Sequence, residues 1–208
     1  MIKYLLYGAG ISNLCCAKFL TKRKIDFEFL VKDEEKDNEV LGRFKNKIIT
    51  ISNLDYERLK DYVIVRSPGI PHFDNVLKYC YENKIKVISE IELALSFNNK
   101  GKYIVITGSN GKTTVVSLLY NIFKSVYPST VLAGNIGVPL IEFVDQINDD
   151  TNVILEISSF QLEDTYSLKP LIGAILNLTP NHLNHVESIE YYYQSKLKLV
   201  EWSKIFIL

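Results

Sequence analysis

Short apolar runs alternate along this chain with longer segments in which apolar residues recur every three or four positions. The short runs predict buried strands, and the periodic segments between them predict helices. This alternation is typical of parallel α/β construction, so we predict an α/β fold. The predicted strands lie at 4–7, 27–31, 62–66, 86–88, 103–107, 153–157, 173–177 and 204–208.

The predicted strands form two series, which indicates two domains. The polar segment 98–102, with the sequence Asn-Asn-Lys-Gly-Lys, separates the series and is the best candidate linker. We therefore expect a first domain at 1–97 and a second domain at 98–208. No tandem repeat or low-complexity tract is visible in either part.

The strongest chemical signal is a glycine loop between a predicted strand at 103–107 and a predicted helix. Its glycines let backbone N–H groups turn toward an anion, Lys112 can reach the outer phosphates, and the Thr113 hydroxyl suits a magnesium ion. The loop is a variant, because Ile106 occupies the position of the first glycine in the strict pattern. The alternative is an ordinary strand-to-helix turn. The residues expected to bind a nucleoside triphosphate are Gly108, Ser109, Asn110, Gly111, Lys112, Thr113 and Thr114.

The helix expected after this loop carries an apolar stripe with the spacing of an amphipathic helix. A stripe of this kind predicts a helix that packs on a sheet, which agrees with the strand before the loop and the loop itself. The stripe consists of Val115, Leu118, Leu119, Ile122, Phe123 and Val126.

A second glycine loop follows the first predicted strand and contains Gly8 and Gly10. A dinucleotide fingerprint would have a third glycine at Asn13, so the helix cannot approach the strand in the usual way. We favour a mononucleotide or a nucleotide-sugar diphosphate at this helix N-terminus, with a simple tight turn or NAD binding as alternatives. The rigid turn Ser67-Pro68-Gly69-Ile70-Pro71 ends another strand at the same edge and is expected beside this loop.

Three polar residues of the second domain stand in apolar surroundings. Glu156 interrupts an apolar strand, where a magnesium ion on the nucleotide would provide a partner and a salt bridge to lysine is the alternative. His182 follows the carboxyl end of a strand, although an isolated histidine is more often structural or solvated. Lys196 shares a helix face with apolar residues and could meet His182, whereas the alternative is a lysine that extends to solvent.

Composition narrows the classes of partner. Lys plus Arg equals Asp plus Glu at 24 each, so no basic field favours nucleic acid. No apolar stretch approaches membrane-spanning length, and we expect a soluble, cytoplasmic protein. Cys15, Cys16 and Cys80 lack the spacing of a zinc site or a disulfide framework, and we interpret them as buried thiols in a reducing compartment.

Together these residues resemble the Mur ligase family, ATP-dependent ligases that build the peptide stem of peptidoglycan. The resemblance implies a Rossmann-like UDP-substrate-binding domain at 1–97 and an incomplete P-loop ATPase-type domain at 98–208. The rest of the second domain and a third domain would be absent, so we expect a fragment that is inactive by itself. The run 158–162, Ser-Ser-Phe-Gln-Leu, favours the members that add D-glutamate. The resemblance rests on 8–10, 67–70, 107–114, 134–137, 155–163 and 177–183.

The resemblance also implies an activity: a monomeric ligase that joins D-glutamate to UDP-N-acetylmuramoyl-L-alanine through an acyl phosphate, with ATP and Mg²⁺ as cofactors. Lys112 would neutralise the transferring phosphoryl group, and Thr113 and Glu156 would bind one magnesium ion. His182 and a carbamylated Lys196 would bind a second ion, since a carbamate offers oxygen ligands. The implied substrate-binding residues are Gly10, Ile11, Ser12, Ser67, Pro68, Gly69, Asn135, Ser158, Gln161 and His182.

The chain departs from the family pattern at two places. Asn181 and Asn184 replace acidic residues near the second metal, and Glu34 and Glu35 follow Asp33 where they would repel a diphosphate. The alternatives are a non-catalytic nucleotide-sugar binding module, a Rossmann oxidoreductase, and a related ligase that adds L-alanine, a diamino acid, D-Ala-D-Ala or glutamate to folate.

Overall fold

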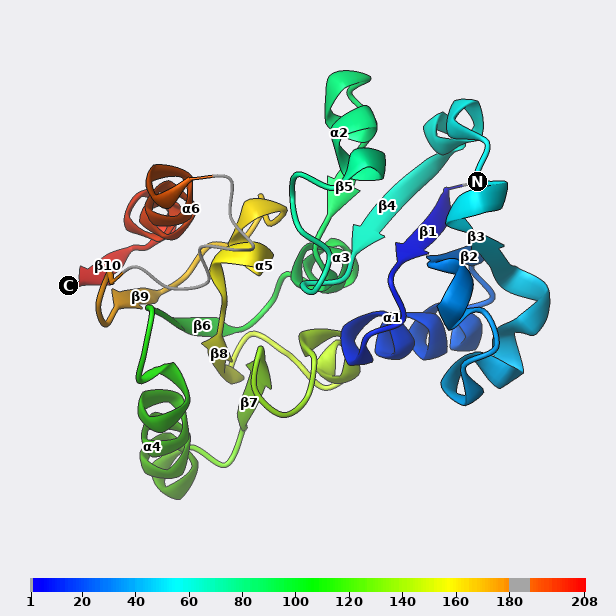
Figure 1. Cartoon of the computed structure of the whole chain (residues 1–208). Helices are drawn as coiled ribbons and strands as arrows, with labels where there is room; N and C mark the ends of the chain where they lie inside the picture. Colours follow the sequence, from blue (N-terminus) through cyan, green and yellow to red (C-terminus); the bar gives the residue numbers. More distant parts are fainter. Residues whose placement is uncertain (1, 180–187) are drawn as a thin grey trace. The chain divides into compact units, whose positions relative to one another are not determined.

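The computed structural model describes residues 2–179 and 188–208 (Figure 1). Among these residues the strands form two five-stranded sheets in which neighbouring strands run parallel. Helices or 3-10 turns connect successive strands, so the predicted α/β fold class is confirmed. None of the described helices combines the length and the apolar composition that a bilayer-spanning helix needs.

Two compact units make up the chain, Met1–Glu90 and Ile91–Leu208. Helix α3 (Glu90–Phe97) therefore lies almost entirely in the second unit, where the expected linker at 98–102 follows it. Each unit contains one of the two sheets, in agreement with the two series of predicted strands.

The first unit has the strand order β3-β2-β1-β4-β5, so the order reverses between β1 and β4. Strand β1 lies at the centre with both faces covered, which explains why its residues form a continuous apolar run. Leu5 of this strand packs with Val76 and Leu77 of helix α2, and Cys15, Cys16 and Cys80 are buried as predicted. The elements are β1 (Lys3–Tyr7), α1 (Ile11–Lys22), β2 (Phe27–Val31), β3 (Ile48–Thr50), β4 (Tyr62–Arg66), α2 (Asn75–Glu82) and β5 (Val87–Ile88), with 3-10 helices at Asp33–Glu35, Glu39–Lys47, Ile51–Asn53 and Tyr56–Asp61.

The second unit has the strand order β10-β9-β6-β8-β7, with β6 at its centre. Helix α4 covers one face, where Val116 packs with Ile104 and Ile154. Helix α6 lies so close to β9 that a Cβ on Gly173 would come within 2.0 Å of Ser203 Oγ. The elements are β6 (Lys102–Thr107), α4 (Lys112–Val126), β7 (Thr130–Gly134), a 3-10 helix (Leu140–Phe143), β8 (Asn152–Glu156), α5 (Ser159–Glu163), β9 (Ile172–Ile175), α6 (Ile189–Trp202) and β10 (Ile205–Ile207).

All eight predicted strands form, but the structure adds β3 and β7, which the apolar pattern does not reveal. Both lie at the edge of their sheets, where a strand needs fewer buried residues. The packing predicted for α4 is half wrong: Leu118, Ile122 and Val126 are exposed. The face of α4 that contacts the sheet is centred on Val116, so one flank of the predicted stripe extends beyond the sheet.

Candidate functional site

The glycine loop follows β6 and leads into α4, as the sequence predicts. Gly108 and Gly111 have φ angles of +152° and +80°, and Gly111 is the N-cap of α4. A side chain at either position would be strained, so the two glycines make this turn possible. The turn brings the loop backbone to the positive end of the α4 dipole, where phosphate groups bind.

The loop is held against the carboxyl end of β9 by residues to which the sequence analysis assigns no individual role. Ser109 Oγ donates to Thr179 O at 2.7 Å and accepts from Thr179 N at 2.9 Å and from Tyr192 Oη at 3.1 Å. The Asn177 side chain accepts from Asn110 N at 2.9 Å and donates to Asn110 O at 3.0 Å. The sequence could have indicated Asn177 and Thr179 as site residues, because they follow a predicted strand. It could not have indicated Tyr192, which is 83 residues away from Ser109.

Lys112 begins α4 with its ammonium group against the loop. Its Nζ donates to Gly108 O at 2.8 Å and to Ser109 O at 3.1 Å. The side chain is half-buried. An ammonium at this point of the loop can neutralise phosphate oxygens bound by the loop backbone.

Glu156, the last residue of β8, is buried at 1% exposure beside the start of α4. Its Oε2 accepts from Thr113 Oγ1 at 2.9 Å and its Oε1 accepts from Asn135 Nδ2 at 2.9 Å. The structure therefore brings together three predicted site residues. No lysine pairs with Glu156 among the ion pairs of the described residues, so the alternative of a salt bridge is wrong.

Asn135 reaches Glu156 because β7 and β8 approach closely at their ends. A Cβ on Gly134 would lie 2.1 Å from Glu156 O, and Asn135 N donates to the same oxygen at 2.9 Å. Only glycine fits this contact. The glycine of the Gly-Asn-Ile-Gly run thus positions the amide that follows it.

Lys196 lies on α6 with 1% of its surface exposed, which contradicts the alternative of a lysine that extends to solvent. Its Nζ donates to Gly108 O at 3.1 Å and lies 4.4 Å from the centre of the Tyr192 ring. Burial, with a smaller effect from the Lys112 charge, lowers the pKa of Lys196 to about 7. His182, Asn181 and Asn184 lie outside the described residues, so the predicted meeting of His182 with Lys196 stays a prediction.

Ser158 and Gln161 bind each other at the start of α5. Ser158 N and Oγ both contact Gln161 Oε1 at 3.0 Å, and Ser158 Oγ accepts from Gln161 N at 3.3 Å. This is a capping box, and its Ser-x-x-Gln spacing was visible in the sequence. The pair fixes the start of α5 next to Glu156, and its predicted contact with the sugar substrate stays a prediction.

The glycine loop of the first unit lies beside the turn 67–71, as expected. Ser67 N donates to Tyr7 O at 2.9 Å. A Cβ on Gly10 would lie 2.8 Å from Ser67 Oγ, so a larger residue at this position would require the Ser67 side chain to move. Gly10 is the N-cap of α1, and Ile11 and Ser12 form its first turn. Pro68 and Gly69 lie between Ser67 and Ile70, whose side chains both pack against Gly8 of this loop.

Asp33 follows β2, and its carboxylate is engaged within the first unit. Ser52 donates to it through both its backbone N–H, at 3.3 Å, and its hydroxyl. These hydrogen bonds lower the pKa of Asp33. The carboxylate thus fixes the turn after β3.

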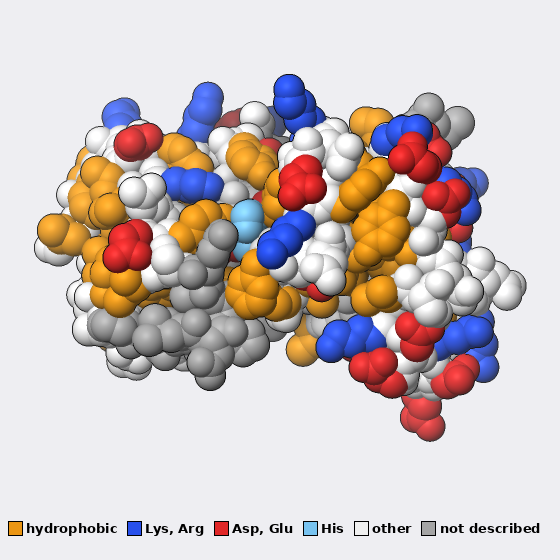
Figure 2. All heavy atoms as spheres, turned by 45° about the horizontal axis from the view of Figure 1, so that its top comes forward, with side chains coloured by type: hydrophobic (Ala, Val, Ile, Leu, Met, Phe, Trp, Pro, Cys, Tyr) orange, Lys and Arg blue, Asp and Glu red, His pale blue; other side chains and the backbone are white. Residues whose placement is uncertain are grey.

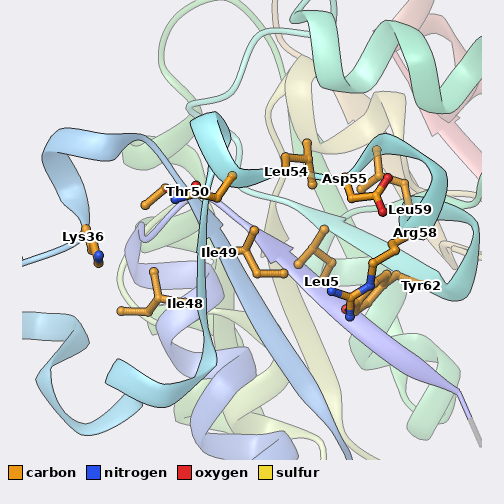
Figure 3. A pocket seen from close by; sticks show the side chains of 11 residues that line it. Leu5, Lys36, Ile48, Ile49, Thr50, Leu54, Asp55, Arg58, Leu59 and Tyr62 are labelled. Atoms are coloured by element: carbon orange, nitrogen blue, oxygen red, sulfur yellow. Dashed lines mark hydrogen bonds between the residues drawn. The ribbon is translucent and has the colours of Figure 1, made fainter.

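A cavity of about 210 Å³ lies on the sheet of the first unit beside β3 (Figure 3). Its apolar floor separates Lys36 from Arg58 and Tyr62. Arg58 donates to Tyr62 at 3.4 Å and Tyr62 donates to Glu28, so the polar groups at this end are paired with one another. No residue of either glycine loop contributes to its wall. The lining residues are Leu5, Lys36, Ile48, Ile49, Thr50, Asn53, Leu54, Asp55, Arg58, Leu59 and Tyr62.

Within the described ranges, no cluster of three His, Cys, Asp or Glu residues has the geometry of a metal site. The Thr113 and Glu156 oxygens could contribute to one only with further oxygen ligands, such as phosphates and water. Basic and acidic side chains are interspersed on the face shown in Figure 2.

Comparison with known proteins relates this site to a family. The model of the Mur ligase middle domain matches residues 106–208, which include the glycine loop before α4 and Glu156. The UDP-N-acetylmuramoylalanine–D-glutamate ligase of Caldicellulosiruptor saccharolyticus is 37% identical over 206 residues, which are 96% of this chain and 45% of that protein. The same ligase of Caldicellulosiruptor bescii is 39% identical over 204 residues, which are 95% of this chain and 44% of that protein.

A solved structure agrees at the level of the fold. The UDP-N-acetylmuramate-alanine ligase of Thermotoga maritima matches with a TM-score of 0.53 and 14% identity, over 99% of this chain and 48% of that one. The chain spans less than half of the length of the curated relatives it matches. The sequence matches and the shared fold lead to one conclusion: the chain belongs to the Mur ligase family.

Proposed function

We propose that this chain supplies the ATP-phosphate site and the UDP-sugar site of an ATP-dependent ligase that adds D-glutamate to UDP-N-acetylmuramoyl-L-alanine. The observation that carries the proposal is the buried carboxylate of Glu156, which accepts from the exposed Thr113 and Asn135 at the start of α4, directly after a glycine loop of phosphate-binding form. The relatives at 37% and 39% identity are named as D-glutamate ligases, which supports D-glutamate as the added amino acid. A cytoplasmic monomer without a nucleic-acid or membrane partner remains our expectation.

The donor set at the loop fits a magnesium ion. Thr113 and Glu156 contribute a hydroxyl and a carboxylate oxygen, 2.9 Å apart. Magnesium prefers oxygen ligands and is commonly held by one or two protein groups, phosphates and water. The ion would supply charge neutralisation on the ATP phosphates. Asn135 would keep the Glu156 carboxylate in place through its hydrogen bond to Oε1.

The residues of the loop would then perform most of the work of phosphoryl transfer, which consists of positioning and charge stabilisation. The N–H groups from Gly108 to Thr114 would hold the phosphates. Lys112 would leave its contacts with Gly108 O and Ser109 O and pair with the outer phosphoryl oxygens, which are stronger acceptors because they carry charge.

In the proposed reaction, the carboxylate of the L-alanyl group attacks the γ-phosphorus of ATP, and ADP leaves with an acyl phosphate formed. The amine of D-glutamate then attacks the acyl carbon, loses a proton, and expels phosphate as the amide forms. Asn135, which bonds to Glu156, and the bonded pair Ser158 and Gln161 would line the acyl end of the sugar substrate. His182 and Lys196, as a carbamate, would hold a second magnesium ion. The burial of Lys196 beside Gly108 supports this role.

The first unit would bind the UDP end of the substrate. Gly10, Ile11 and Ser12 begin α1 at the point where the strand order reverses, the usual ligand site of an open α/β sheet. The turn of Ser67, Pro68 and Gly69 would close the other side of this diphosphate site, since Ser67 already contacts the loop.

Phosphate release by the full-length protein that carries this chain tests the proposal. With ATP, Mg²⁺ and UDP-N-acetylmuramoyl-L-alanine present, we expect release that depends on D-glutamate. L-Alanine, meso-diaminopimelate and D-Ala-D-Ala serve as controls, each with the UDP-sugar acceptor suited to it. Release that depends on one of these amino acids instead would contradict the D-glutamate assignment. Binding of the UDP-sugar without any phosphate release would favour a non-catalytic binding module.

A further inference from the structure

Asn13 occupies the position at which a dinucleotide fingerprint has its third glycine. That glycine normally lets the helix pack closely on the first strand. Here the side chain of Asn13 fills the space instead, with no exposed surface. The first glycine loop therefore contains a polar side chain where the common pattern has none.

The carboxamide of Asn13 contacts three backbone carbonyls. Nδ2 lies 2.9 Å from Tyr7 O, 2.9 Å from Gly8 O and 3.1 Å from Val65 O. Two amide hydrogens thus serve three acceptors, so one N–H is shared. Tyr7 and Gly8 end β1 and begin the loop, whereas Val65 belongs to β4.

These contacts lie at the point where the strand order reverses. Strands β1 and β4 are neighbours there, and ligands of open α/β sheets bind beyond their carboxyl ends. A single side chain from the first turn of α1 therefore ties the helix to both strands. The ties fix the direction of the Gly8 carbonyl and the distance between the loop and the helix start.

Asn13 Oδ1 is buried and has no hydrogen-bond partner among the described residues. A buried acceptor without a partner lowers stability. The benefit of the side chain therefore comes from its donor side, through the three carbonyls.

We propose that Asn13 is a positioning residue, which holds the Gly8–Ser12 loop in the geometry that binds the diphosphate of the UDP-sugar. This inference rests on the proposed function, because it names the residue that shapes the proposed UDP site. Asn13 does not touch the ligand in this account. Its effect passes through the loop backbone, so its loss weakens UDP-sugar binding and leaves the ATP-phosphate site of the second unit unchanged.

The test compares Asn13→Ala and Asn13→Gly with Cys16→Ala in the full-length protein. Cys16 is equally buried in α1 and lies further along the helix from the loop than Asn13, so it controls for lost stability. We expect the Asn13 variants to bind UDP-N-acetylmuramoyl-L-alanine at least about tenfold more weakly by calorimetry. KM for the UDP-sugar should rise, while kcat and the affinity for ATP stay within about twofold. Cys16→Ala should lower Tm and leave the UDP-sugar affinity unchanged.

Wild-type-like UDP-sugar affinity in both Asn13 variants would overturn the inference. A loss of affinity in Cys16→Ala as large as that in an Asn13 variant with the same Tm would also overturn it. If neither Asn13 variant folds, exchange of the Asn13 side-chain amide protons in the wild-type protein decides. Slow exchange compared with Asn148, and a further slowing on addition of UDP, support the role. Fast exchange contradicts it. Failure of the wild-type protein itself to bind the UDP-sugar would instead contradict the proposed function.

Discussion

At the scale of single residues, the second unit concentrates its unusual polar groups around one loop. Lys112 and Lys196 both donate to Gly108 O, and Thr113 connects the loop to Glu156. Burial, with a smaller effect from the nearby Lys112 charge, lowers the pKa of Lys196 to about 7. We therefore propose different tasks for the two lysines: Lys112 pairs with phosphate oxygens, and Lys196 loses its charge near neutral pH.

Replacement of Lys112 tests the first task. We expect Lys112→Ala to lower kcat for D-glutamate-dependent phosphate release by about 10² to 10³ in the full-length protein, because one preorganised charge contact in a transition state has this effect. Tm should change little, since the side chain is half-buried and its partners are loop carbonyls. Lys169→Ala, at an exposed lysine away from the loop, is the matched control and should keep full activity.

The pH dependence of stability tests the second task. The pKa of Lys196 is about 7 in the folded chain and 10.5 in the reference state, so the unfolded chain binds a proton that the folded chain lacks between these values. Lys196 therefore lowers stability progressively as pH falls from about 10.5 to about 7. We expect Lys196→Met to raise the free energy of unfolding by more than about 1 kcal/mol at pH 6, with a smaller gain at pH 9.5.

Urea unfolding of this chain in CO₂-free buffer measures that difference directly. Leu199→Met is the control for the introduction of methionine, because Leu199 is also buried on α6. Its effect on the free energy of unfolding should be the same at both pH values. A gain from Lys196→Met that is equal at both pH values would show that the amine does not titrate between them.

At the scale of elements, α4 shows how far an apolar stripe predicts packing. The helix begins where the loop predicts, and Leu119 and Phe123 pack on the sheet with Val116. Ile122 lies on the same predicted stripe and is 53% exposed. A stripe with this spacing spans a wider arc than one sheet surface covers, so the sequence could not say which flank is buried.

Matched truncations on α4 test this assignment. We expect Val116→Ala to lower the free energy of unfolding by about 2 kcal/mol, because it removes buried methyl groups and leaves a cavity. Ile122→Ala removes more atoms but should cost less than about 0.5 kcal/mol, since the side chain is mostly in water. Denaturation midpoints of the two variants in urea give the comparison, and an equal cost would mean that the contact face of α4 is assigned incorrectly.

The sequence predicts the site residues at the ends of strands better than it predicts the contacts between distant segments. Glycine positions and a carboxylate in an apolar strand reveal Gly108, Gly111 and Glu156, because these residue types are unusual in such places. Edge strand β7 and the bond from Tyr192 to Ser109 depend on which segments meet in space. Residue spacing carries no information about contacts of that kind.

At the scale of the whole molecule, two parallel sheets each present a glycine loop at a helix start. One loop follows β1, where the strand order of the first unit reverses, and the other follows β6, the central strand of the second unit. A ligase that joins a nucleotide-activated sugar to an amino acid at the expense of ATP needs two phosphate sites of this form. We therefore propose that the first loop binds a UDP-sugar and that the second loop binds ATP.

Calorimetric titration of this chain with UDP-N-acetylmuramoyl-L-alanine tests the first assignment, with UDP-N-acetylmuramic acid and NAD as controls. We expect saturable binding of the alanine-bearing substrate, weaker binding of the sugar that lacks alanine, and no response to NAD. Binding of NAD with no response to either UDP-sugar would contradict this assignment.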